Sequence, residues 1–241
     1  MRQLGRILLA VVACVAGSSQ AGVSEIGPSH QEVISSSGFL SAHPDIRWRA
    51  EGVRAYEAGK HVLAGSHFQR AAHFADKPSQ AMFAEMLWAG MGVPRDPVAA
   101  YIWMDLAAER HYRPFLIKRE QYWQALTPEQ RKRAVDEGQQ IYAEYGDDVA
   151  KPRLELKLRR GARGATGSRL GSASALRVLV PGPGGQWVEI PGSHYYAPQY
   201  WEPERYWEWQ DRIWKAPPKG QVDIGPLKQV PAPKAGSEPS S

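Results

Sequence analysis

The feature that most constrains the fold is a long central run in which helix signals recur at regular spacing. Between Pro44 and Asp147, apolar residues return every three to four positions, which is typical of amphipathic helices packed on one face. Six segments carry this pattern, at residues 44–58, 61–75, 78–90, 97–110, 112–125 and 128–145. The pattern predicts an all-α domain over residues 44–147.

The ends of these segments carry helix-start residues. Asp96 can cap the fourth helix, and Pro97 follows at the first helical position, where its missing N–H removes no hydrogen bond. Thr127 and Gln130 have the spacing of a capping box, in which each side chain bonds the other's backbone amide. The segments are therefore separate helices joined by short turns.

The helices also repeat in pairs. Ala71-Ala72 returns as Ala107-Ala108, 36 residues later, and such small side chains let the two helices of a pair approach closely. A helix–turn–helix unit with a period in the thirties is typical of α-solenoids. The sequence therefore predicts a short α-solenoid of about three helix pairs.

One unit also carries a family motif. Residues 84–108 read A-E-M-L-W-A-G-M-G-V, then an aspartate, an alanine pair, a tryptophan and a second alanine pair. This stretch resembles a complete Sel-one-like repeat, a member of the tetratricopeptide-like superfamily, of the type found in exported bacterial proteins. The resemblance implies a right-handed superhelix with a concave face for protein partners, and it gives structural roles to Gly90, Gly92, Asp96, Ala100, Trp103, Ala107 and Ala108.

The first 21 residues form a signal segment. Arg2 and Arg6 precede an apolar run, and Ser19-Gln20-Ala21 offers a small-x-small cleavage site. The apolar run is too short to cross a bilayer, and no later stretch is apolar enough, so we expect no transmembrane helix in the mature chain. The single cysteine, Cys14, lies either in a lipobox, where it would be lipidated, or simply within the apolar run. Both alternatives place the protein in the periplasm or outside the cell, and the first anchors it to a lipid.

Two segments flanking the helical domain have the composition of flexible chain. Residues 22–43 read as a serine-rich leader, and residues 148–175 as a basic linker rich in Gly and Ser. Residues 151–180 hold eight basic side chains against Glu155 alone. Such a segment is either a solvated linker or, over residues 151–177, a contact for an anionic glycan or lipid surface; nucleic acid is not an expected partner of an exported chain.

The C-terminal part, residues 176–215, combines a β-hairpin with an aromatic segment. Two alternating apolar runs, 176–180 and 186–190, flank a Gly/Pro turn. Eight aromatic residues follow between positions 195 and 214. They either pack back on the solenoid as a strap or stack on a glycan, with the candidate binding residues Trp201, Trp207, Trp209 and Trp214. Residues 216–241 are rich in Pro and read as a disordered tail.

The chemistry-bearing residues do not form a catalytic or metal-binding pattern. His61, His67 and His73 are six residues apart and do not share one helix face, and there is no G-x-S-x-G nucleophile motif. We therefore expect no enzyme, no metal and no cofactor. The sequence predicts an envelope scaffold that binds an unknown envelope protein through its repeat groove; the alternative is a glycan- or peptidoglycan-binding protein that uses the C-terminal aromatic residues.

Overall fold

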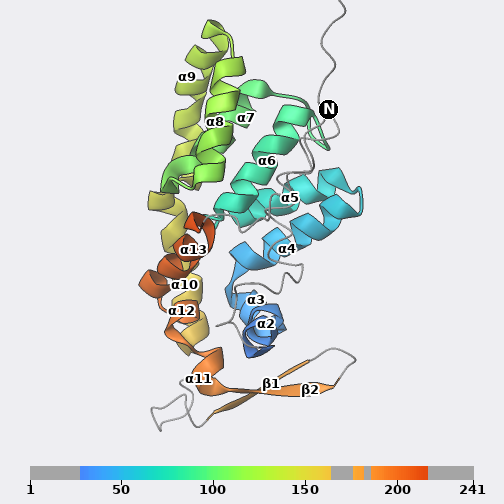
Figure 1. The fold of residues 1–241 in the computed structure, drawn as a ribbon, viewed down its shortest axis with the longest axis vertical. Helices are drawn as coiled ribbons and strands as arrows, with labels where there is room; N and C mark the ends of the chain where they lie inside the picture. The colour runs from blue at the N-terminus through green and yellow to red at the C-terminus, as the bar shows by residue number, and fades with distance from the viewer. Residues whose placement is uncertain (1–27, 164–175, 182–185, 217–241) are drawn as a thin grey trace, which may run out of the picture.

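A computed structural model describes residues 28–163, 176–181 and 186–216. The described chain is mostly helical, with one small sheet of two strands (Figure 1). The signal segment, Cys14 and, apart from Ala216, the Pro-rich tail lie outside the described residues. Within the described ranges, no helix has the length and apolar character required to span a membrane.

The six helices of the central domain lie where the apolar period places them. They are α4 (Pro44–Glu57), α5 (His61–Ala72), α6 (Lys77–Ala89), α7 (Pro97–Ala107, extended by the 3-10 turn Ala108–Arg110), α8 (Arg113–Ala125) and α9 (Pro128–Tyr145). Their caps are also the predicted ones. Asp96 accepts hydrogen bonds from the amides of Val98 and Ala99, and Thr127 and Gln130 form the capping box.

The first two helix pairs pack as pairs. Helix α4 lies against α5 and α6 against α7, with small residues at the contacts. A Cβ on Gly52 would lie only 2.6 Å from the Phe68 ring, and Ala64, Ala72 and Ala107 are fully buried. Close approach of the helices thus depends on small residues, among them Ala72 and Ala107 of the alanine repeat.

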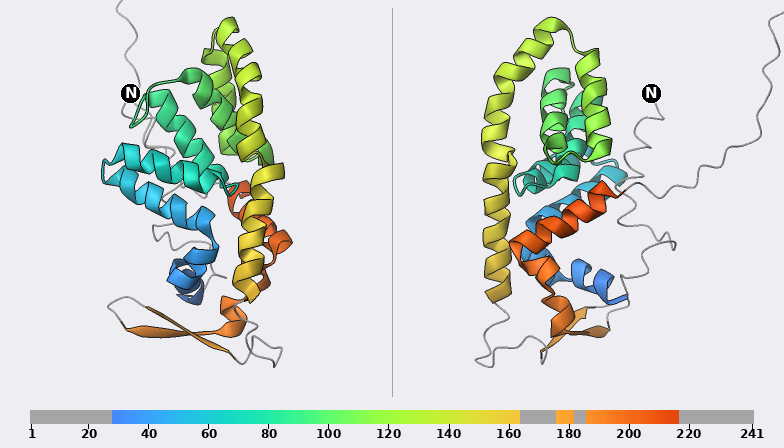
Figure 2. Two further views of the ribbon diagram at one scale, coloured as in Figure 1. Left: turned by 180° about the vertical axis from the view of Figure 1, so that it is seen from behind. Right: turned by 60° about the vertical axis from the view of Figure 1, so that its left-hand side comes forward.

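Helices α8 and α9 do not form a third pair of the same kind. Each has its main contacts with α7, so the two helices clasp α7 between them (Figure 2). Gly138 of α9 faces Ile102 of α7, with 3.7 Å between a Cβ at Gly138 and the isoleucine methyl group. The central domain therefore consists of two packed helix pairs, α4–α5 and α6–α7, followed by α8 and α9, which both pack against α7.

The basic segment after residue 147 is a helix, so the linker prediction was wrong for its first part. Helix α10 (Asp147–Arg163) buries Ala150, Leu154 and Leu158, which are four residues apart and share one face. The basic residues occupy the remaining faces. Because they are numerous, the composition of the segment indicated a linker although the apolar stripe is present. Residues 164–175 of the expected linker lie outside the described residues.

The described part of the serine-rich leader is also helical, which corrects the leader prediction over residues 28–43. Helix α2 (Pro28–Ser35) buries Val33, and α3 (Ser37–Ala42) buries Phe39 and Ala42. Ser36 between them accepts a hydrogen bond of 3.3 Å from the Phe39 amide. Serine acts here as a helix cap, although a run of serines is also typical of flexible chain.

The C-terminal segments form a hairpin and three helices. Strands β1 (Arg177–Pro181) and β2 (Trp187–Pro191) pair antiparallel, with Leu179 opposite Glu189, and confirm the predicted hairpin. They lead into α11 (Gly192–Tyr195), α12 (Pro198–Trp201) and α13 (Pro203–Lys215). The hairpin lies at the end of the molecule opposite the α8–α9 turn (Figure 1).

The described residues bury apolar side chains in two main clusters. The first core lies within the central domain apart from Trp214 of α13, and it includes Phe68, Met86, Trp103 and Leu106. The second core joins α2, α3, α10, the hairpin and the C-terminal helices; its members are Val33, Phe39, Ala42, Leu154, Leu158, Val180, Ile190, Tyr195, Tyr200, Trp201, Tyr206 and Trp209.

Candidate partner-binding groove

An open groove of ≈ 430 Å³ lies on the central domain. Helices α4, α5 and α9 supply most of its lining, and the loop after α5 supplies the rest. The lining residues are Trp48, Ser66, Gln69, Arg70, His73, Phe74 and Tyr145. This volume lies within the range of ligand-binding clefts, and the mixture of rings and polar groups suits recognition of an extended segment.

The indole of Trp48 is the centre of a cationic contact. The guanidinium carbons of Arg47 and Arg70 each lie 4.8 Å from the ring centroid, and the His67 ring stacks on Trp48 at 5.3 Å. Among the described residues, neither arginine forms an ion pair with a carboxylate. Both guanidinium groups therefore keep hydrogen-bond donors available for an anionic ligand.

The helical hairpin geometry brings these residues together. Helices α4 and α5 run antiparallel through a turn at Gly59, which has a positive φ of 72°. Trp48 and Arg70 are equally far in sequence from that glycine, so they lie opposite each other across the pair. This relation is the signal by which the sequence could have identified the groove, and the sequence reasoning missed it.

Helix α10 contributes a further cation at the groove. Nη1 of Arg153 donates hydrogen bonds of 2.5 Å to the carbonyl oxygen of Glu144 and 3.4 Å to that of His73. Burial, and then the charge of Arg153, lower the pKa of His73, while burial and then Arg70 lower the pKa of His67. Both imidazoles are therefore neutral at neutral pH, and arginine supplies the positive charge of the groove.

The groove offers a hydrogen-bond donor beside its arginines. Burial, and then Glu144, raise the pKa of Tyr145 to about 12, so its phenol keeps its proton and can donate a hydrogen bond. The described part of the chain contains no group of three or more His, Cys, Asp or Glu placed to hold a metal ion. The arrangement can contact a flat or extended ligand and neutralise its negative charge.

The repeat-motif residues all have structural positions. Gly90 ends α6 in the left-handed region at φ 70°, and Gly92 follows at φ 71°. A Cβ on Gly92 would lie 2.6 Å from the Val62 amide nitrogen, so this loop packs directly on the start of α5. Ala100, Trp103, Ala107 and Ala108 are buried in the first core.

The candidate tryptophans of the C-terminal segment are mostly covered. Trp201, Trp209 and Trp214 have exposed fractions of 5%, 7% and 8%. Trp207 is half-buried, with Arg110 at 4.5 Å and Lys151 at 5.2 Å from its ring centroid. Trp214 packs with Phe115 of α8, whereas Trp201 and Trp209 belong to the second core. The structure therefore places the aromatic segment as an intramolecular strap.

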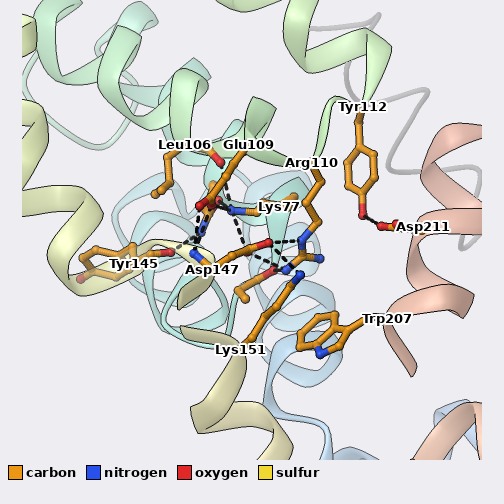
Figure 3. Close-up of polar contacts among 12 residues, drawn as sticks. Lys77, Leu106, Glu109, Arg110, Tyr112, Tyr145, Asp147, Lys151, Trp207 and Asp211 are labelled. Atoms are coloured by element: carbon orange, nitrogen blue, oxygen red, sulfur yellow. Dashed lines mark hydrogen bonds and ion pairs between the residues drawn. The ribbon is translucent and has the colours of Figure 1, made fainter. Parts of the chain in front are cut away.

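A buried charged cluster fixes the strap and α10 to the central domain (Figure 3). Lys77 is fully buried and its Nζ lies 2.6 Å from Glu109 and 3.0 Å from Asp147. Asp147 also accepts two hydrogen bonds from Arg110, at 2.6 and 2.8 Å. Burial opposes the charge of Asp147, but the Arg110 hydrogen bonds and the nearby cations hold its pKa below the ordinary value. Sequence reasoning also missed this cluster, because its members are far apart in the chain.

No family model, curated protein or solved structure matches this chain. The Sel-one-like resemblance therefore rests on the motif residues of the sequence alone.

Proposed function

We propose that this chain is a scaffold of the bacterial cell envelope that binds a partner protein through the groove beside Trp48. The observation that carries the proposal is the pair of guanidinium groups, Arg47 and Arg70, on one indole without a carboxylate partner among the described residues. Such donors favour a partner segment that presents Asp or Glu side chains, because charge-assisted hydrogen bonds are the stronger ones.

Two further features support a binding role. The motif around Gly90 resembles repeats of families that act as protein-binding scaffolds, and the N-terminal signal segment supports the envelope location. Glycan binding by the C-terminal tryptophans, the alternative function, would require α13 to leave the surfaces that bury Trp209 and Trp214.

Site-specific photo-crosslinking in the cell of origin tests the proposal. A photoreactive amino acid at Ser66, in the groove, should give one dominant protein adduct, whereas the same probe at Gln139, an exposed position on α9, should not. Mass spectrometry then identifies the partner. Equal adduct patterns at the two positions would contradict a binding role for the groove.

The purified partner allows the charge argument to be measured. Arg70→Gln should weaken its affinity by about tenfold or more, since a hydrogen bond to a charged group contributes about 1.5–3 kcal/mol. Arg54→Gln is the matched control, because Arg54 is an exposed arginine of α4 paired with Glu51 and does not line the groove. Equal losses in the two variants would show nonspecific charge attraction.

A further inference from the structure

The open side of the groove continues along α5 toward the start of that helix. Val62 and Leu63 lie there, with exposed fractions of 72% and 46%. Val62 lies one helical turn before Ser66, and Leu63 lies two turns before Arg70. Because Ser66 and Arg70 both line the groove, the two apolar side chains share its side of α5. This face of α5 therefore has an apolar end at Val62 and Leu63 and a cationic end at Arg70.

The middle of this face is low enough for another backbone to approach. The hydroxyl group of Ser66 donates a hydrogen bond of 3.3 Å to the carbonyl oxygen of Val62, so it is turned back on α5 itself. The carboxylate of Glu51, whose charge acts on His67 nearby, is already paired with Arg54 at 2.7 Å. The face thus offers apolar contact at one end, close approach in the middle and positive charge at the other end.

The spacing of the two ends distinguishes between the kinds of elongated segment that can lie on this face. Leu63 and Arg70 are separated by about 10.5 Å along the axis of α5, since each residue of a helix rises about 1.5 Å. Residues of a strand rise about 3.3 Å and point alternately to opposite sides, so side chains on one side recur at about 6.6 and about 13 Å. A helix laid along α5 reproduces the required spacing, because its positions i and i+7 lie on one face.

We propose that the partner segment is an amphipathic helix that lies along α5 and carries an apolar residue and an acidic residue seven positions apart. The apolar side chain packs on Val62 and Leu63, and the acidic one pairs with Arg70. Charge complementarity selects the acidic group, and burial of exposed apolar surface favours an apolar group at the other end. The inference rests on the proposed function and deepens it, because it states which kind of segment occupies the same groove.

Photo-crosslinking along α5 in the cell of origin tests the inference. A photoreactive amino acid at Val62 and, in a second strain, at Gln69 should capture one and the same protein. Mass spectrometry of the crosslinked peptides then locates the partner residue joined at each position. A partner helix places the two joined residues about seven positions apart, whereas a strand places them about three positions apart.

The outcomes separate this inference from the proposed function. Joined residues about three positions apart overturn the helix, and capture from position 69 without capture from position 62 overturns the apolar contact. Both of these results leave the groove as the binding site. Capture from neither position, or the same adducts as from the control position Gln139, contradicts the proposed function and the inference with it.

Variants of the apolar end give a second measurement with the purified partner. Val62→Ser with Leu63→Ser should weaken the affinity by about tenfold, because binding then buries less apolar surface. Ile117→Ser with Val135→Ser is the matched control and should leave the affinity unchanged. These two residues of α8 and α9 have exposed fractions of 51% and 60% and do not line the groove. Equal affinities for the wild-type chain and the double variant of α5 would overturn the apolar contact.

Discussion

The two cores of this protein are built in different ways. Apart from Trp214, the first core comes from one continuous stretch, α4 to α9, and its contacts join helices that are neighbours in sequence. The second core collects α2, α3, α10, the hairpin and α11 to α13, whose buried residues range along the chain from Val33 to Trp209. Nε2 of His43, for example, donates a hydrogen bond of 2.7 Å to the carbonyl oxygen of Tyr200. Local periodicity therefore describes the first core and says little about the second.

The largest effect is expected at the junction of the two cores. Asp147→Ala removes the carboxylate shared by Lys77 and Arg110. It leaves Glu109 as the one ion-pair partner of Lys77 among the described residues and takes the carboxylate from the buried Arg110, which should lower the free energy of unfolding by about 3–5 kcal/mol. Asp148→Ala, at the exposed neighbouring position, should change it by less than about 0.5 kcal/mol. Urea denaturation measures both, and similar small losses would show that the cluster is not a stabilising junction.

Acid should weaken the same junction. The pKa of Asp147 is depressed in the folded protein, so its contribution is present above the ordinary value of 3.8 and is lost as the pH falls below it. The difference in stability between the wild-type chain and Asp147→Ala should therefore shrink at acidic pH. A difference that stays constant from neutral to strongly acidic pH would contradict the ion-pair account.

The second core depends on the apolar stripe of α10. Leu158→Ala should lower the free energy of unfolding by about 2–5 kcal/mol, because Leu158 is fully buried. Leu156→Ala, on the exposed face of the same helix, should change it by less than about 0.5 kcal/mol. If thermal denaturation gives the two variants equal midpoints, the segment behaves as the linker that its composition suggested.

Two glycine turns of the central domain, one at Gly59 and one at Gly92, give a smaller effect. Gly59→Ala should cost about 1–2 kcal/mol, since its φ of 72° is unfavourable for alanine and open space surrounds the position. Gly92→Ala has the same backbone cost and adds a clash with the start of α5, so it should destabilise more. Equal losses measured by denaturation would show that close packing of the loop contributes nothing.

The last prediction concerns the pH dependence of stability around the second core. Burial, and then the charge of Asp76, raise the pKa of Asp45 to about 7, while burial lowers the pKa of His43 to about 4. The raised carboxyl pKa makes stability fall with rising pH between about 4 and 7; the lowered imidazole pKa makes it rise from about 4 to 6.5. The two trends oppose each other, so Asp45→Asn should turn a flat profile into one that rises with pH. An unchanged profile would contradict the Asp45 assignment.

These contrasts explain what the sequence could and could not predict. The boundaries of α4 to α9 and the capping box at Thr127 followed from period and cap chemistry, which act over a few residues. The packing of α8 and α9 against α7 could not be predicted in this way. Both helices have ordinary amphipathic patterns, which fit a third helix pair as well as the arrangement observed. Helix α10 was not predicted, because basic residues outnumber the apolar stripe of Ala150, Leu154 and Leu158. Helix α3 was not predicted, because Ser36, which caps it, lies in a serine run that resembles a flexible leader.

The candidate site shows the same difference between features that neighbouring residues determine and features that distant residues determine. Gly92 lies in a turn with positive φ and Asp96 caps α7, features that depend on neighbouring residues, whereas the groove at Trp48 and Arg70 needs the antiparallel packing of α4 and α5. The C-terminal tryptophans drew attention because they are concentrated in sequence. Packing between distant segments decides that three of them are covered: Trp201 and Trp209 lie in the second core, and Trp214 packs into the first.

The central claim is that the chain after residue 146 is part of the folded body, so that the groove at Trp48, and not the C-terminal tryptophans, is the open binding surface. Hydrogen exchange of backbone amides, followed by mass spectrometry on the full chain, tests it most directly. The account predicts that amides in residues 154–162 and 206–214 exchange as slowly as those of α6 and α7. Exchange of both segments at the rate of an unstructured peptide would contradict it and return the tryptophans to solvent.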